Sequence, residues 1–221
     1  MIERLLPAPV AAAEAFTDRT DVVLYPEEAA AVARAVEKRR REFGTVRACA
    51  RDALRELGLP SAPILPGPNG EPGWPPGVVG SMTHCPGYRG AVVARSDDLS
   101  SIGIDAEVDQ PLPAGLVDRI ALPEERDGLA GLRGWGVAVD RLLFCAKETV
   151  YKTWYPLTNR YLGFHEAVVT LGDDGTFTAV LHLDTPPGSS PAPSDWPTGF
   201  SGRWLARNGL VISACSVPAA R

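Results

Sequence analysis

The sequence has few cysteines and histidines and no long apolar run. Of its 221 residues, four are cysteines and three are histidines. The cysteines form no Cys-x-x-Cys pair, which argues against a structural zinc, so we expect reduced and mostly buried thiols. No apolar run is long enough to span a bilayer, and the start of the chain lacks the charged and apolar regions of a signal peptide. We therefore expect a cytoplasmic protein without a membrane partner.

Positive charge is not in excess either. Lys and Arg number 22 against 27 Asp and Glu, which gives a formal net charge of −5. A chain of this charge has no global basic field, so nucleic acid is not an expected partner and an anionic ligand must be held by a local basic cluster. The hydrophobic fraction of 45% is normal for a packed core, and the length suits one large domain or two small ones.

Two helices are expected early in the chain, after a short strand at residues 21–24. Pro26 suits the first turn of the first helix, which finishes in a run of basic residues. Thr45 can cap the second helix, and Gly58 can close it. These signals predict a break between the two helices near Gly44.

Basic side chains from both helices can meet one ligand. Arg39 and Arg47 are separated by nearly two whole turns, so they can point at a single anion if Gly44 does not break the helix axis. The other basic residues of this region are typical of a solvated helix face.

A stretch dense in proline and glycine follows at residues 60–84 and predicts an irregular binding loop. It ends in Gly-Ser-Met-Thr-His, where Ser81, Thr83 and His84 stand among small residues. Backbone amides and hydroxyls in such a segment can hold a phosphate. Taken alone the pattern is weak, because Gly-Ser pairs are common in turns and a single histidine is more often structural.

Two strands are expected at residues 90–95 and 101–108. In the second strand Asp105 and Glu107 alternate with buried positions and point to the same side, roughly 6.5 to 7 Å apart. Two carboxylates on one face repel each other unless a positive charge lies between them, and a hard divalent ion can supply it. A plain exposed strand face is the alternative.

A strongly periodic segment at residues 139–156 predicts a helix that ends before Pro156. Its buried stripe is Leu143, Ala146, Val150 and Trp154. Beside the stripe run Glu148 and Lys152, one turn apart at the border of the apolar face. Alone they suit an ordinary surface pair worth roughly 0.2 to 0.5 kcal/mol.

Hairpin patterns follow at residues 165–183 and 202–217, the second around an Asn-Gly turn. We therefore predict an α+β fold of two pseudo-duplicated halves, residues 1–110 and 111–221, each with helices and an antiparallel sheet. The active site is expected at their interface. There Asp105 and Glu107 from one half can meet Glu148 and Lys152 from the other, which suits Mg²⁺ facing a polyphosphate.

The same residues carry a family resemblance. Gly-Ile-Asp-Ala-Glu at 103–107 and Leu-Phe-Cys-Ala-Lys-Glu-Thr-Val-Tyr-Lys at 143–152 resemble the paired motifs of the 4′-phosphopantetheinyl transferase superfamily, in its monomeric Sfp-like and EntD-like branch. The blocks at 70–77, 80–84 and 154–164 are similar to flanking blocks of that branch. The matches run from about residue 38 to residue 164, and relatives often have a lysine where this chain has Pro66, Pro68 and Asn69.

The resemblance implies a monomer that transfers the phosphopantetheine arm of coenzyme A to a serine of an acyl or peptidyl carrier protein, releasing adenosine 3′,5′-bisphosphate. It implies that Mg²⁺, with Mn²⁺ as the alternative, is held by Asp105, Glu107 and Glu148. It assigns coenzyme A contacts to Arg39, Arg47, Ser81, Thr83, His84 and Lys152, with Lys147 as a secondary contact.

The catalytic residues expected on this basis are Glu148 as base, Lys152 as a stabiliser of charge on the pyrophosphate, and Glu107 as the alternative base, with a metal-bound water also able to act. Two other functions use the same residues. A nucleotide pyrophosphohydrolase with Mg²⁺ would need no protein acceptor, and a coenzyme A binding or sensing module would carry out no reaction. Metal-dependent modification of a carrier serine separates the transferase from both.

Overall fold

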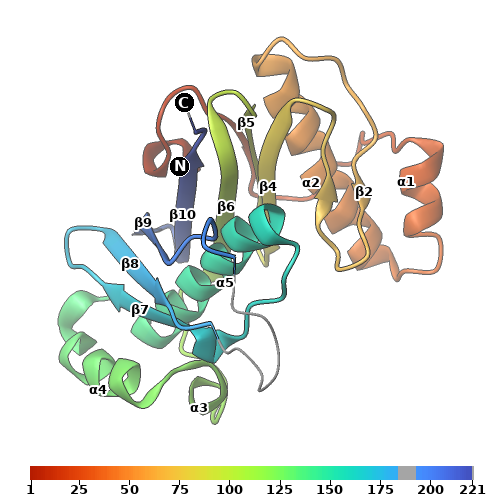
Figure 1. The fold of residues 1–221 in the computed structure, drawn as a ribbon. Coiled ribbons are helices and arrows are strands. Elements are labelled where there is room, and N and C mark those ends of the chain that lie inside the picture. The colour runs from red at the N-terminus through yellow and green to blue at the C-terminus, as the bar shows by residue number, and fades with distance from the viewer. Residues whose placement is uncertain (184–192, 221) are drawn as a thin grey trace.

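The computed structural model describes residues 1–183 and 193–220, which form two antiparallel sheets side by side, each with a long helix against one face (Figure 1). The first sheet has the order β1-β5-β4, with β1 at Ala11–Ala15, β5 at Tyr88–Arg95 and β4 at Val78–Cys85. The second has the order β6-β10-β9-β8-β7, with β6 at Leu99–Val108, β10 at Leu210–Pro218, β9 at Gly199–Arg207, β8 at Thr176–Leu181 and β7 at Ala167–Leu171.

Helix α2 at Glu37–Glu56 packs on the first sheet, and helix α5 at Val139–Thr158 packs on the second. The predicted α+β class with antiparallel sheets is confirmed. The remaining elements are short: η1 Ile2–Leu5, α1 Pro26–Ala31, β2 Leu65–Pro66, β3 Pro72–Gly73, α3 Val117–Ile120, α4 Pro123–Gly131, η2 Arg133–Trp135 and η3 Phe164–Glu166. No helix in the described ranges is long and apolar enough to cross a membrane.

Helix α2 replaces the two helices that were expected. It runs unbroken through Gly44, so the predicted start at Thr45 is wrong. Val22 and Leu24, in the segment before α1, lie beside Gly44, where a Cβ would make ordinary van der Waals contacts of 3.4 to 3.9 Å. Thr45 is buried and accepts a hydrogen bond from Arg19 N at 3.0 Å instead of capping. Tertiary packing thus outweighs the helix cost of glycine, about 1 kcal/mol.

The N-terminal segment also differs from expectation. Residues 21–24 form no strand, whereas Ala11–Ala15 forms β1 and pairs with β5. Alanine has a low strand propensity, so this strand depends on its partner and on α2 rather than on its own composition. The expected strands at residues 90–95 and 101–108 are confirmed as β5 and β6.

The end of the Pro-rich stretch is strand β4, not irregular loop. Val78–Cys85 pairs with β5 along its whole length, so Ser81, Thr83 and His84 project from a regular strand. The prediction of irregular backbone holds for the preceding residues, apart from the two-residue pairing of β2 with β3.

Side-chain hydroxyls join the two sheets where β4 lies beside β6. Ser81 Oγ accepts a hydrogen bond from Ile104 N, and Thr83 Oγ1 accepts one from Ala106 N, both at 3.1 Å. These strands belong to different sheets, and the two hydroxyls replace a backbone ladder between them. The predicted division at residue 110 places strand β6 in the first half. In the structure β6 is hydrogen-bonded to β10 in the second sheet.

Helix α5 lies close against β6 because Gly103 has no side chain. A Cβ there would be 2.2 Å from Thr153 Oγ1 and 2.3 Å from Thr149 O. The predicted stripe of α5 is confirmed as buried. The predicted end before Pro156 is wrong, since α5 continues to Thr158, where the Thr158 hydroxyl donates to Trp154 O at 3.2 Å.

The later strands follow their sequence patterns. β7 pairs with β8, and β9 pairs with β10 around Asn208 and Gly209, which both have positive φ as an Asn-Gly primed turn requires. All four cysteines are free and buried, as expected.

Candidate functional site

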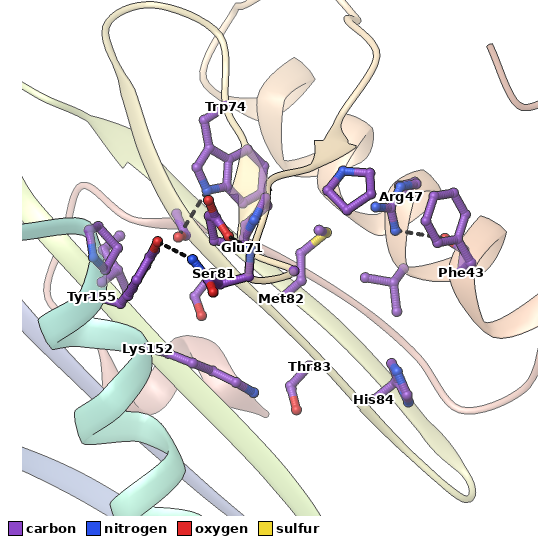
Figure 2. A pocket seen from close by; sticks show the side chains of 18 of the residues that line it. Phe43, Arg47, Glu71, Trp74, Ser81, Met82, Thr83, His84, Lys152 and Tyr155 are labelled. Carbon is purple, nitrogen blue, oxygen red and sulfur yellow. Dashed lines mark hydrogen bonds between the residues drawn. The ribbon is translucent and has the colours of Figure 1, made fainter. Parts of the chain in front are cut away.

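A cavity of about 590 Å³ lies between α2, the β2–β3 hairpin, β4 and α5 (Figure 2). Segments that lie far apart in the sequence therefore contribute side chains to it. The predicted site residues that line it are Arg39, Arg47, Ser81, Thr83, His84, Glu148 and Lys152. Asp105 and Glu107 on β6 and Lys147 on α5 do not line it. Asp105 nevertheless contacts two residues that do, Thr83 and Lys152.

The α2 wall of the cavity carries positive charge. Arg39 Nη1 lies 2.6 Å from His84 Nε2, which joins α2 to β4 across the cavity edge. Burial and the nearby Arg39 cation lower the pKa of His84, so its imidazole is neutral at physiological pH and can accept the guanidinium N–H. The hydrogen bond with His84 thereby holds the Arg39 guanidinium cation in place at the cavity wall.

Arg47 is buried and already engaged with the chain. Its Nε donates to Ile64 O at 2.8 Å, and its guanidinium carbon lies 3.1 Å from the centre of the Phe43 ring. Burial lowers the pKa of Arg47 to about 10, which leaves it charged at neutral pH. Arg39 and Arg47 both reach the cavity because α2 is continuous through Gly44.

The opposite wall carries negative charge around Asp105. Its Oδ1 accepts hydrogen bonds from Lys152 Nζ at 2.7 Å and from Thr83 Oγ1 at 3.0 Å. Its Oδ2 is buried and has no partner among the described residues. An unpartnered buried carboxylate oxygen is costly, and this atom remains available to a cation or a hydrogen-bond donor.

Two further carboxylates lie close to Asp105. Glu107 Oε2 pairs with Arg141 Nη1 at 3.0 Å, and Glu148 makes no hydrogen bond to any described residue. Burial raises the pKa of Glu107, and the Asp105 charge raises it further. Burial also raises the pKa of Glu148, although Lys152 opposes the shift.

Three carboxylates at the site face two cationic side chains, Lys152 and Arg141. Burial lowers the pKa of Lys152, but Asp105 and Glu148 outweigh it and raise the value, so Lys152 is a firm cation. Lys152 and Arg141 leave one carboxylate without a partner. The described residues contain no ready cluster of three or more metal-ligating side chains. The oxygen donors and the orphaned Asp105 oxygen nevertheless fit a hard divalent cation.

Lys147 is placed away from the cavity described above. Its Nζ lies 2.9 Å from Glu125 Oε2 and donates to the carbonyls of Phe164 and Ala167, both at 2.7 Å. Its side chain is 1% exposed. Lys147 therefore ties α5 to α4 and β7.

Several contacts at the site were not predicted from the sequence. Arg141 pairs with Glu107, although it lies seven positions before Glu148 and hence on the same face of α5. Asn69, noted above only as a departure from the family's lysine, forms a hydrogen bond with Tyr155, 86 positions away. Only the folded chain reveals such a pair.

Comparison with known proteins gives consistent matches. Residues 27–94 match a family described as the 4′-phosphopantetheinyl transferase N-terminal domain, and residues 101–201 match the 4′-phosphopantetheinyl transferase superfamily. The chain is 54% identical to 4′-phosphopantetheinyl transferase Svp of Streptomyces mobaraensis, over 99% of this chain and 90% of Svp.

Two further relatives are similar over nearly their whole length. 4′-Phosphopantetheinyl transferase PptT of Mycobacterium tuberculosis is 48% identical, over 97% of this chain and 96% of PptT. 4′-Phosphopantetheinyl transferase Npt of Nocardia iowensis is 46% identical, over 97% of this chain and 98% of Npt.

Proposed function

Since the chain belongs to the 4′-phosphopantetheinyl transferase superfamily, as an enzyme that loads carrier proteins from coenzyme A, we propose that the cavity between α2 and α5 is its active site. The observation that carries the proposal is the unpartnered Asp105 Oδ2, because the other oxygen of the same carboxylate accepts from Lys152, which lines a cavity with basic residues on its far wall. This arrangement of charges suits a polyphosphate with a divalent cation at one end.

The basic wall is proposed to hold the 3′-phosphate and pyrophosphate of coenzyme A. Arg39 and His84 reach the cavity together, and the Ser81 hydroxyl keeps its own proton to donate because its oxygen is the acceptor toward Ile104 N. Thr83 donates to Asp105, so its contribution is to orient that carboxylate. Arg47 contributes positive charge to the same wall, while its Nε donates a hydrogen bond to the Ile64 carbonyl.

Asp105, Glu107 and Glu148 are the residues that would hold Mg²⁺, with Mn²⁺ as the alternative. When bound, the cation would neutralise charge on the pyrophosphate oxygens. Oxygen atoms are available for this role, since one Asp105 oxygen has no partner in the described residues and Glu148 has no hydrogen bond there.

Transfer requires the carrier serine oxygen to form a bond to the β-phosphorus while the bond from that phosphorus to the bridging oxygen breaks. The serine proton must leave, and adenosine 3′,5′-bisphosphate departs with the electron pair of the broken bond. Glu148 is the proposed base because it lines the cavity and is not hydrogen-bonded, whereas Glu107 is paired with Arg141. Lys152 stabilises charge on the pyrophosphate.

A single chain supplies both walls of the cavity, which supports the proposal that the enzyme works as a monomer. Its four free cysteines agree with a reducing, cytoplasmic setting. The pyrophosphohydrolase and the coenzyme A sensor gain no support from the three relatives, each of which is named as a transferase.

The direct test is intact-protein mass spectrometry of an apo carrier protein incubated with this enzyme, coenzyme A and Mg²⁺. We expect a mass gain of one phosphopantetheine arm on the carrier, and none when its serine is replaced by alanine. Adenosine 3′,5′-bisphosphate should accumulate in equal amount. Coenzyme A binding without a mass gain on several unrelated carriers would contradict the transferase assignment to this cavity.

Lys147 is proposed to stabilise the fold rather than contact coenzyme A. Removing one partner of a buried ion pair costs about 3 to 5 kcal/mol. Because Glu125 would keep hydrogen bonds from Leu122 N and Val169 N, we expect Lys147→Met to lower the free energy of unfolding by about 3 kcal/mol in urea titrations. An unchanged stability with a KM for coenzyme A raised about tenfold would instead support the predicted phosphate contact.

A further inference from the structure

The β2–β3 hairpin forms a stiff flap over one side of the cavity. Gly67 N donates to Glu71 O at 2.7 Å, and Asn69 N donates to Glu71 Oε2 at 2.9 Å, so the tip is held by its own hydrogen bonds. Pro66 and Pro72 restrict the backbone on either side of that tip. These bonds and prolines make the tip stiff.

The root of this hairpin is fixed in the core. Ile64 is fully buried, its N–H donates to Glu28 Oε1 at 2.9 Å, and its carbonyl accepts from Arg47 Nε at 2.8 Å. Directly after β3, Trp74 Nε1 donates to Gly80 O at 3.0 Å. Movement of the hairpin must therefore occur beyond these two anchors.

The tip is fastened by a single exposed hydrogen bond. Asn69 Nδ2 donates to Tyr155 Oη at 2.6 Å, and this is the one hydrogen bond that joins residues 65–73 to other elements in the described part of the chain. Figure 2 shows Tyr155 reaching from α5 toward the hairpin, near Glu71 and Trp74. Water can replace an exposed bond of this kind at a small net cost.

Both partners of this bond line the cavity, and Tyr155 lies on the turn of α5 that follows Lys152. The bond thus joins the β2–β3 hairpin, which covers one side of the cavity, to α5, which carries Lys152. A ligand that extends from Arg39 to Lys152 lies beneath the hairpin while this bond is formed. The hairpin can release such a ligand by opening at its tip.

We propose that the Asn69–Tyr155 hydrogen bond is a latch that holds the β2–β3 hairpin closed over coenzyme A and slows its dissociation. The proposal rests on the placement of coenzyme A in this cavity. Asn69 and Tyr155 are positioning residues, since neither needs to touch the reacting phosphorus. The latch sets how long the co-substrate stays, not how fast the bond to phosphorus forms.

Breaking the latch should change binding more than turnover. Because one hydrogen bond is involved, we expect Asn69→Ala and Tyr155→Phe each to raise the dissociation rate and Kd of coenzyme A about 2- to 12-fold. KM for coenzyme A should rise with Kd, whereas kcat at saturating coenzyme A should change by less than about twofold. The double variant should resemble either single variant, because both remove the same bond.

The experiment measures Kd by calorimetry and the dissociation rate by stopped-flow chase of a fluorescent, thiol-labelled coenzyme A. Tyr25→Phe, which removes a tyrosine hydroxyl outside the cavity, is the matched control. Lys152→Ala tests the placement of coenzyme A independently and should weaken its binding.

Unchanged Kd and dissociation rate in both latch variants, with weakened binding in Lys152→Ala, would overturn the latch and leave the proposed active site intact. Additive effects of Asn69→Ala and Tyr155→Phe would also overturn it, since independent contacts add. If Lys152→Ala binds coenzyme A as tightly as the unsubstituted enzyme, the proposed cavity and the latch both fail.

Discussion

Glu148→Gln is expected to transfer phosphopantetheine about 10² to 10⁴ times more slowly than the unsubstituted enzyme. Glutamine keeps the shape of the side chain but cannot take the serine proton, and it weakens the proposed metal site. Glu148 has no hydrogen bond in the described structure, so the exchange breaks none and removes only a charge interaction with Lys152, and the fold should be retained. The rate should be measured at saturating coenzyme A and carrier, with circular dichroism as the check on folding.

Glu56→Gln is the matched control, because Glu56 is exposed at the end of α2 and far in sequence from every site residue on α5. It should leave the rate unchanged. Glu107→Gln distinguishes the alternative base. If Glu107→Gln loses more than Glu148→Gln at saturating Mg²⁺, the base is Glu107. Retention of more than about a tenth of the activity in Glu148→Gln would remove Glu148 from the catalytic role altogether.

Removal of divalent cations is expected to abolish transfer completely. Three carboxylates lie near Lys152, burial and the Asp105 charge raise the pKa of Glu107, and Asp105 Oδ2 has no partner among the described residues. The two nearby cations, Lys152 and Arg141, do not neutralise this group. Excess chelator should therefore give no mass gain on the carrier, and added Mg²⁺ or Mn²⁺ should restore it.

A second measurement keeps the metal site testable apart from activity. A cation that binds only the folded chain stabilises it by about 2.7 kcal/mol at a hundred times its Kd, so Mg²⁺ should raise Tm. Asp105→Asn should remove that rise, because it replaces the carboxylate that holds the orphaned oxygen. Full activity in the presence of chelator, or an equal Mg²⁺ effect on Tm in Asp105→Asn, would rule out the proposed metal ligands.

Much of this protein was determined by local sequence. Period-two alternation placed Asp105 and Glu107 on one face of β6, and the 3.6-residue period put Glu148 and Lys152 beside the buried stripe of α5. The Asn208-Gly209 turn also follows from residue type, because both positions need positive φ. Such features depend on neighbours a few residues apart, so the sequence alone predicts them.

The tertiary structure decided the features that depend on distant residues. Helix α2 runs unbroken through Gly44 while it packs on β1 and β5 of the first sheet. The Ser81 and Thr83 hydroxyls join the two sheets because β6 lies beside β4. Lys147 and Lys152 share one motif, yet one is buried against Glu125 and the other pairs with Asp105 at the cavity.

Lys147 and Lys152 are five positions apart on α5, which is more than one turn but less than two, so their side chains point in different directions and meet different neighbours. The local pattern fixes that rotation, but the partner that each lysine meets is set by packing of elements far apart in the chain. The sequence therefore determined which residues could carry chemistry, and the tertiary contacts determined which of them reach the cavity.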